Sequence, residues 1–265
     1  MSDSDRIKPD DASIGMYLED LRHKRYQIPT FQREVVWERD DIKKLWDSIY
    51  RFYPIGSILI WKADIELQKH RRIGGHDIAR PDKTNNFQYI IDGQQRTTAL
   101  LTSLYGIEDE WDGDFDPTLY IDLTIEEADT VETANYSERF LFWDEIETGE
   151  GSSSRNVPRK EKYDEGYIVK LSEIQEEFTA IERELFESGH TDFDDPVRQR
   201  LKHIHDVLDK YRVPFIELHD IGISEVTEIF ERVNQEGEPL DIFDIVVAKS
   251  SGRRMPTRVG FTCVS

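Results

Sequence analysis

The chain has 265 residues, and its 55 acidic and 34 basic side chains give a formal net charge of −21. This length can bury a core in one large domain or two small ones. No apolar run of about 18 residues occurs, which excludes a membrane-spanning helix, and we expect no signal peptide. Cys263 is the single cysteine, so an internal disulfide and a cysteine-based zinc site are excluded. A cytoplasmic location is the resulting expectation.

The negative charge predicts a protein adapted to a salt-rich cytoplasm, because strong screening relieves the repulsion within an acidic surface. An ordinary acidic protein is the alternative. Both interpretations argue against a broad DNA-binding face. A local basic groove stays compatible with either, because exposed charges are screened beyond roughly 10 Å at 0.1 M salt.

The first 124 residues predict a loose N-terminus over 1–13 and a core of mixed strands and helices over 14–124. Ile42, Leu45, Trp46 and Ile49 form an apolar stripe on one helix, which Asp40 or Asp41 is expected to cap. Residues 64–86 read as an irregular loop. The expected helices are 13–21, 40–52 and 97–105, and the expected strands are 57–62, 87–91 and 118–123.

The rest of the chain predicts an acidic insertion with a flexible loop over 125–166, then a mainly helical half over 167–249. The basic segment 250–265 has no apolar periodicity, and we interpret it as a truncated or frame-shifted tail, with a disordered terminus as the alternative. Because strands and helices follow no regular βαβ rhythm, an α+β fold is favoured over a doubly wound one. The helices expected here are 171–187, 195–210, 224–233 and 241–249, with strands at 140–143 and 213–218.

The segment Asp92-Gly93-Gln94-Gln95-Arg96 lies where an apolar strand gives way to a helix. Such a turn gathers free backbone N–H groups, and an arginine in the first helical turn can fork onto a phosphate. The alternative is a plain helix start, with Asp92 as N-cap and Gln95 closing a capping box. The helix dipole disfavours an arginine there by roughly 0.3–1 kcal/mol, which a bound anion would reverse. The pattern leaves both interpretations open.

Two further segments carry polar candidates, and spacing supports neither strongly. Gln32 and Arg33 follow an extended Ile-Pro segment, and the alternative to a site role is that they lie at the surface on the edge of a strand. Arg232 and Asn234 lie near a glycine-containing turn, where a helix end is the favoured interpretation. The histidines show no metal-binding spacing, and no phosphate-loop motif occurs.

Taken together and in order, four segments resemble the DUF262 family, also called the GmrSD restriction endonuclease N-terminal domain. The resemblance covers about residues 15–249 and implies a ParB/sulfiredoxin-like mixed-sheet core with a mainly helical C-terminal half. The segments are Ile28-Pro29-x-Phe31-Gln32-Arg33-x-x-Val36-Trp37, Tyr53-Pro54-Ile55-Gly56-Ser57, Asp92-Gly93-Gln94-Gln95-Arg96-Thr97-Thr98 and Phe230-x-Arg232-x-Asn234-x-x-Gly237-x-Pro239-Leu240.

This resemblance implies binding and hydrolysis of a nucleoside triphosphate (GTP or ATP) in a DNA-modification-dependent restriction or phage-defence system. Asp92 is also a hypothetical ligand of Mg²⁺. The implied catalytic residues are Asp92, Gln94, Gln95 and Arg96, and the implied phosphate-binding residues are Gln32, Arg33, Gly93, Arg96, Thr97, Thr98, Arg232 and Asn234.

The nuclease chemistry of such systems often lies in a C-terminal HNH-type domain, for which this sequence shows no motif. We therefore expect that the chain alone does not cut DNA and that a partner nuclease or a missing C-terminal domain supplies this activity. DNA and a nucleotide are the implied partners. The alternatives are a non-catalytic DNA-recognition or nucleotide-sensing module and an inactive fragment.

Overall fold

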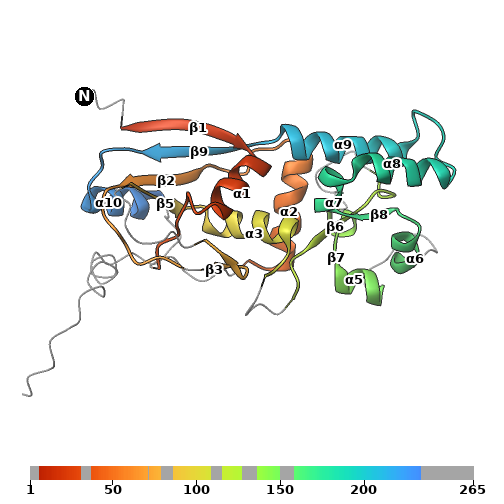
Figure 1. Cartoon of the computed structure of the whole chain (residues 1–265), viewed down its shortest axis with the longest axis horizontal. Coiled ribbons are helices and arrows are strands. Elements are labelled where there is room, and N and C mark those ends of the chain that lie inside the picture. The colour runs from red at the N-terminus through yellow and green to blue at the C-terminus, as the bar shows by residue number, and fades with distance from the viewer. Residues whose placement is uncertain are drawn as a thin grey trace, which may run out of the picture.

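A four-stranded mixed sheet and a three-stranded sheet organise the chain in this computed structural model (Figure 1). The structure describes residues 6–30, 37–70, 72–78, 86–108, 115–126, 136–149 and 158–233. The larger sheet has the order β1-β9-β2-β5, in which β2 runs parallel to β9 and the other pairs are antiparallel. Its strands are β1 Ile7–Ser13, β9 Arg212–Leu218, β2 Ile58–Ala63 and β5 Phe87–Asp92. The predicted α+β class and mixed sheet are confirmed.

The two faces of the larger sheet are covered by different helices, because alternate residues of a strand point to opposite faces. Ile58, Ile60 and Ile90 belong to the main core, which also contains buried residues of α1, α2 and α3. Leu59 and Trp61 face the other side, where α10 packs against them. These helices are α1 Ile14–Arg22, α2 Arg39–Tyr50, α3 Gln94–Tyr105 and α10 Ile223–Val233.

An ion pair joins the two parallel strands of this sheet. The Glu217 carboxylate on β9 accepts from Lys62 Nζ on β2 at 2.6 Å and lies 2.9 Å from His219 Nε2. Burial raises the pKa of Glu217, but the contacts with Lys62 and His219 outweigh it and hold the pKa below its usual 4.5. The ionised carboxylate is therefore part of the folded structure.

The N-terminal strand corrects the expectation of a loose segment over 1–13. Ile7–Ser13 pairs with β9 along its whole length, from Ile7 opposite Leu218 to Ser13 opposite Arg212. Most of β1 is exposed, so the segment lacks the apolar alternation that marks a half-buried strand. The main sheet therefore includes two strands from outside the expected core at 14–124, namely β1 and β9. β9 lies in the half that was expected to be mainly helical.

The helix positions in this part follow the predicted apolar patterns, with one change at a cap. Ser13 Oγ accepts from Met16 N at 3.3 Å and caps α1. Glu38, and not Asp40 or Asp41, is the N-cap of α2. Asp41 instead accepts from the Glu38 backbone N at 3.1 Å, which satisfies a donor at the helix entrance.

The acidic segment 125–166 is more ordered than the sequence predicted. Its β7 strand is buried and pairs with β6, which also pairs with β8. The strand expected at 140–143 is confirmed as β7, whereas the helices around it have four to six residues, which is too short for a visible apolar period. Residues 127–135 and 150–157 lie outside the described ranges. The elements are β6 Leu119–Asp122, α4 Tyr136–Arg139, β7 Phe140–Phe142, α5 Trp143–Thr148, α6 Arg159–Asp164 and β8 Ile168–Lys170.

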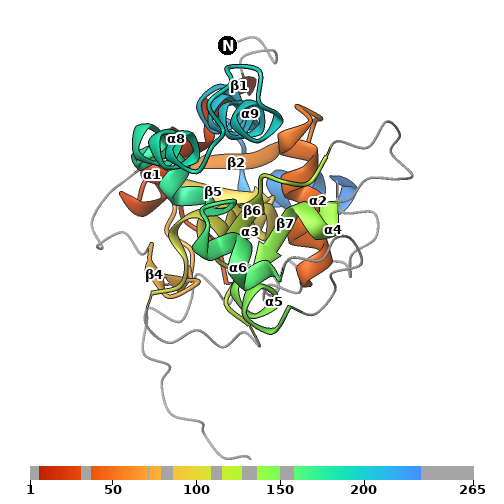
Figure 2. The same ribbon diagram turned by 90° about the vertical axis from the view of Figure 1, so that its right-hand side faces the viewer.

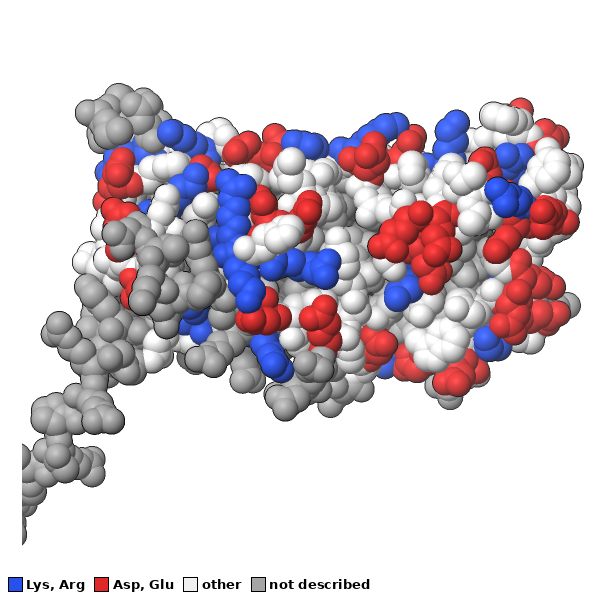
Figure 3. All heavy atoms as spheres, in the orientation of Figure 1, with Lys and Arg blue, Asp and Glu red and all other residues white. Residues whose placement is uncertain are grey.

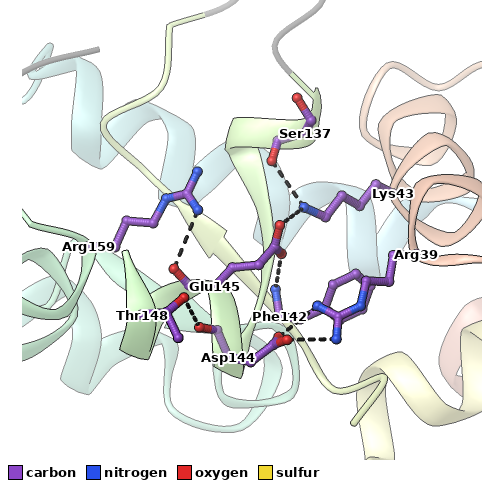
Figure 4. A network of polar contacts seen from close by, with 8 residues as sticks. All are labelled: Arg39, Lys43, Ser137, Phe142, Asp144, Glu145, Thr148 and Arg159. Atoms are coloured by element: carbon purple, nitrogen blue, oxygen red, sulfur yellow. Dashed lines mark hydrogen bonds and ion pairs between the residues drawn. The ribbon is translucent and has the colours of Figure 1, made fainter. Parts of the chain in front are cut away.

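An ionic network, buried at Lys43 and exposed at Asp144, ties this segment to α2 (Figure 4). Lys43 donates to Glu145 at 2.7 Å and to the Ser137 carbonyl at 3.1 Å, and Arg39 pairs with Asp144 at 2.6 Å. Burial lowers the pKa of Lys43, and its pair with Glu145 opposes that shift. Acids that suggested a solvated loop therefore serve as partners for half-buried cations.

The C-terminal half contributes α7 Leu171–Glu176, labelled in Figure 1, and α8 Phe178–Glu187 and α9 Pro196–Lys210, labelled in Figure 2. The single helix expected over 171–187 is two helices that meet at Glu177, where φ is −124°. The expected 195–210 helix is confirmed, with Asp195 as its N-cap. α10 begins at Ile223, so Ser224 lies inside the helix and not at its cap. The predicted 241–249 helix and the 250–265 tail lie outside the described residues.

A short hairpin, formed by β3 Arg72–Ile73 and β4 His76–Asp77, interrupts the loop expected over 64–86.

Surface charge is unevenly distributed (Figure 3). On the face shown, Asp and Glu gather toward the end where α6 and α8 lie, whereas Lys and Arg form a strip near α1. No helix within the described ranges is long and apolar enough to cross a bilayer.

Candidate functional site

The candidate site is the 92–98 turn, which comprises the end of β5, Gly93 and the first five residues of α3. Gly93 is the N-cap of α3 and adopts a left-handed conformation, with φ +96° and ψ 14°. The left-handed conformation favours glycine, and a Cβ atom at this position would lie 2.5 Å from Ile58 Cδ1, so any other residue would also displace the buried Ile58 side chain. The alternative of an Asp92 cap is therefore wrong. A glycine cap offers no side-chain acceptor to the first N–H groups of the helix.

Arg96 forms what we call the arginine clasp between α3 and the 53–57 segment. Its Nη1 donates to the carbonyls of Ile55 at 3.0 Å and Ser57 at 3.1 Å, and its Nη2 donates to Asp92 Oδ2 at 3.0 Å. The side chain is only 17% exposed, so it points inward. Gly56, at φ +79°, makes room for it, because a Cβ atom there would lie 2.7 Å from Nη1.

The clasp gives a second reason for an arginine at the positive end of a helix. The Asp92 carboxylate and two carbonyl dipoles already compensate the guanidinium, so a bound anion is not required to explain it. Sequence reasoning missed this role. The sequence signal was Gly56 in the Tyr-Pro-Ile-Gly-Ser segment, which allows a backbone conformation and a close approach that other residues do not.

Thr97 takes part in a buried hydroxyl relay that holds the turn. Its Oγ1 donates to the Gly93 carbonyl at 2.8 Å and lies 2.8 Å from the Tyr17 hydroxyl on α1. Because the Thr97 proton is used by the carbonyl, the Tyr17 hydroxyl must donate to Thr97. Burial raises the pKa of Tyr17, which keeps this donor protonated.

The other side chains of the turn differ in how they are engaged. Gln94 is 9% exposed, and its amide makes no hydrogen bond within the described part of the chain. Gln95 is half-buried. Thr98 is buried, and its hydroxyl finds no acceptor or donor among the residues that the structure describes.

The comparison with known families confirms the resemblance derived from the motifs. The family described as GmrSD restriction endonuclease, N-terminal domain, matches residues 15–250. The chain belongs to this family. Uncharacterized protein MJ0686 of Methanocaldococcus jannaschii is 27% identical over 248 residues, which cover 88% of this chain. The chain spans 41% of the length of that curated relative. Family membership indicates a component of a restriction system.

The remaining predicted site residues of this GmrSD N-terminal domain are not gathered around the turn by any described contact. Arg232 lies on α10 with 77% of its side chain exposed and pairs with Glu228 one helical turn away. Within the described residues it touches neither Asp92 nor Arg96. Gln32, Arg33 and Asn234 lie outside the described residues.

The Asp92 carboxylate alone does not make a magnesium site. No group of three potential metal-binding side chains occurs in the part of the chain that the structure describes. Arg96 Nη2 donates to Asp92 Oδ2 at 3.0 Å, and the positive charge of the guanidinium repels a second cation at the same carboxylate. Mg²⁺ commonly binds through one or two carboxylates together with substrate phosphates. A magnesium ion would therefore need a nucleotide to supply further ligands.

Proposed function

We propose that this domain binds the phosphates of a nucleoside triphosphate at the 92–98 turn and hydrolyses it within a DNA-modification-dependent restriction system. The observation that carries the proposal is the left-handed Gly93 cap, which leaves the positive end of α3 without a side-chain acceptor beside an inward-facing guanidinium. Helix N-termini of this kind are well suited to anions. The family description supports the restriction context.

In this proposal, phosphate oxygens accept from the backbone N–H groups at the start of α3. The Arg96 guanidinium, of which Nε donates in none of the clasp bonds, adds positive charge where negative charge grows in the transition state. The Gln94 amide positions the attacking water, and the second oxygen of Asp92 orients it. The clasp keeps Arg96 in one orientation, which limits the reorganisation that phosphate binding requires.

A nucleotide-sensing module without turnover is the second candidate. It is favoured by the way the turn uses its own polar groups, because both η nitrogens of Arg96 and the hydroxyl of Thr97 already bind the protein. Such a site can hold a phosphate without rearranging around a transition state. DNA and a partner nuclease stay proposals in both cases, as do the cytoplasmic location and the adaptation to high salt.

The test is release of inorganic phosphate from GTP and from ATP at high salt. We expect multiple turnovers by the wild type and a loss on the order of 100-fold in Gln94→Ala and Asp92→Asn. Asp20→Asn is the matched control, because Asp20 pairs with Arg25 at the surface, away from the turn. Saturable binding without release would favour the sensor, and the absence of nucleotide binding would refute both candidates.

A further inference from the structure

A shallow pocket of about 410 Å³, more open than enclosed, lies on α9, apart from the 92–98 turn. Its lining residues, Pro196, Gln199, Arg200 and His203, recur at the spacing of one helix face. Pockets of this size hold small molecules. The helix end itself is not the site, because Asp195 Oδ1 already accepts from the N–H groups of Val197 and Arg198. The side chains must therefore define what the cavity binds.

Arg200 brings an uncompensated positive charge to the cavity. Its Nη1 donates to the Leu123 carbonyl at 2.8 Å, and among the described residues no carboxylate pairs with it. The Leu123 bond fixes the half-buried guanidinium, while its Nε and Nη2 donate to no described residue. These donors suit the oxygens of an oxyanion.

His203 and Gln199 bring hydrogen-bond acceptors to the same cavity. His203 Nε2 lies 2.9 Å from the Tyr50 carbonyl, which can only accept, so Nε2 carries a proton and Nδ1 is left as the acceptor of the ring. The Gln199 amide nitrogen donates to the Phe193 carbonyl at 2.7 Å, which leaves its oxygen as an acceptor. Hydroxyl or amino groups of a ligand would satisfy these two acceptors.

An exposed aromatic ring lies against His203, one of the residues that line the pocket. The Phe52 ring lies 6.2 Å from the His203 ring, centroid to centroid, and Phe52 is 48% exposed. Its φ of +55° is uncommon for a bulky residue, so the surrounding contacts hold it in this position. The ring offers a stacking surface for a flat group attached to a ligand in the cavity.

We propose that this cavity binds a phosphorylated sugar, either free or as part of a nucleotide. The phosphate would accept from Arg200, and the sugar hydroxyls would donate to Gln199 and His203. In a nucleotide, the base would stack on Phe52. This site is separate from the proposed nucleotide site at α3 and does not depend on it.

The experiment is a titration of the ¹⁵N-labelled protein with ribose 5-phosphate, a mononucleotide or inorganic phosphate, followed by NMR at the Gln199 side-chain amide. We expect saturable shifts with ribose 5-phosphate and at least tenfold weaker binding in Arg200→Gln. Lys202→Gln is the control, because it removes one exposed positive charge from the same helix. It should change the affinity less than twofold. The Arg96→Lys variant should bind ribose 5-phosphate as the wild type does, whatever happens at α3.

The two ligand sources are distinguished by Phe52→Ala. Weaker binding of the mononucleotide alone identifies a nucleotide, and unchanged binding of both compounds identifies the free sugar phosphate. The proposal is overturned if neither ribose 5-phosphate nor the mononucleotide, each at about 10 mM, shifts the Gln199 side-chain amide. It is also overturned if Arg200→Gln binds as well as the wild type. Equal affinity for inorganic phosphate would overturn the roles of Gln199 and His203.

Discussion

Replacing Arg96 by alanine tests the arginine clasp. The substitution removes hydrogen bonds to the carbonyls of Ile55 and Ser57 and the ion pair with Asp92. It also leaves the Asp92 carboxylate beside the start of α3 without its cation. Because Ile55 and Ser57 precede β2, the loss should loosen the entrance to a central strand of the larger sheet.

The expected cost is about 3 kcal/mol of unfolding free energy. Breaking a buried charge pair costs roughly 3–5 kcal/mol, because one partner is left uncompensated. The Arg96 and Asp92 side chains are 17% and 26% exposed, so water replaces part of the lost interaction and the lower end of that range applies. For a chain of this size, about 3 kcal/mol lowers Tm by roughly 6–12 °C.

The assay is urea unfolding followed by circular dichroism, together with a thermal scan. Arg25→Ala is the control, because it breaks the surface pair with Asp20, whose side chains are 50% and 28% exposed, and should cost less than about 1 kcal/mol. Arg96→Lys should recover part of the loss, since an ammonium can reach one acceptor but cannot bridge all three. An Arg96→Ala cost no larger than that of Arg25→Ala would refute the clasp.

Three further substitutions test other parts of the structure. Gly93→Ala should cost about 3 kcal/mol in urea unfolding, because it adds a clash to a left-handed backbone, whereas Gly149→Ala, also left-handed but in open space, should cost only about 1 kcal/mol. Equal costs would contradict the close packing at the turn. Tyr17→Phe should cost about 1 kcal/mol through loss of its hydrogen bond to Thr97, and an unchanged midpoint would argue against the relay. Glu217→Gln should destabilise the protein near pH 7. Because folding lowers the pKa of Glu217, the ionised carboxylate stabilises the folded state above its usual pKa of 4.5. This stabilisation is lost as pH falls through the lower pKa of the folded protein, so the unfolding free energies of the two proteins should converge in acid. A pH-independent difference would contradict this.

Local sequence signals predicted the elements that have long apolar periods or strong caps. The apolar stripe of α2 and the helix at 195–210 belong to this class, and so does the change from strand to helix at Gly93. β1 escaped prediction because an exposed edge strand carries no alternation. The acidic segment 125–166 was misread because its charges are neutralised by residues such as Lys43, about 100 positions away in the chain.

The strand-to-helix turn at 92–98 was predicted in position, but its internal contacts were not. The Asp-Gly pair located the turn, since only a local conformation was needed. The clasp and the hydroxyl relay link residues 41 and 80 positions apart, and no local pattern reports such distances. Their effect is to assign Arg96 and Thr97 a structural role alongside the phosphate-binding role that the motif predicts.

The most direct test of the nucleotide site is an NMR titration with non-hydrolysable GTP and ATP analogues. It follows the backbone amides of Gln94 and Gln95 and uses Asp20→Asn as a control. We predict that these two amides shift saturably in the wild type and in the control, and that the shifts weaken at least tenfold in Arg96→Lys. Amides that stay unmoved at millimolar analogue, in a protein shown to be folded, would contradict phosphate binding at this turn.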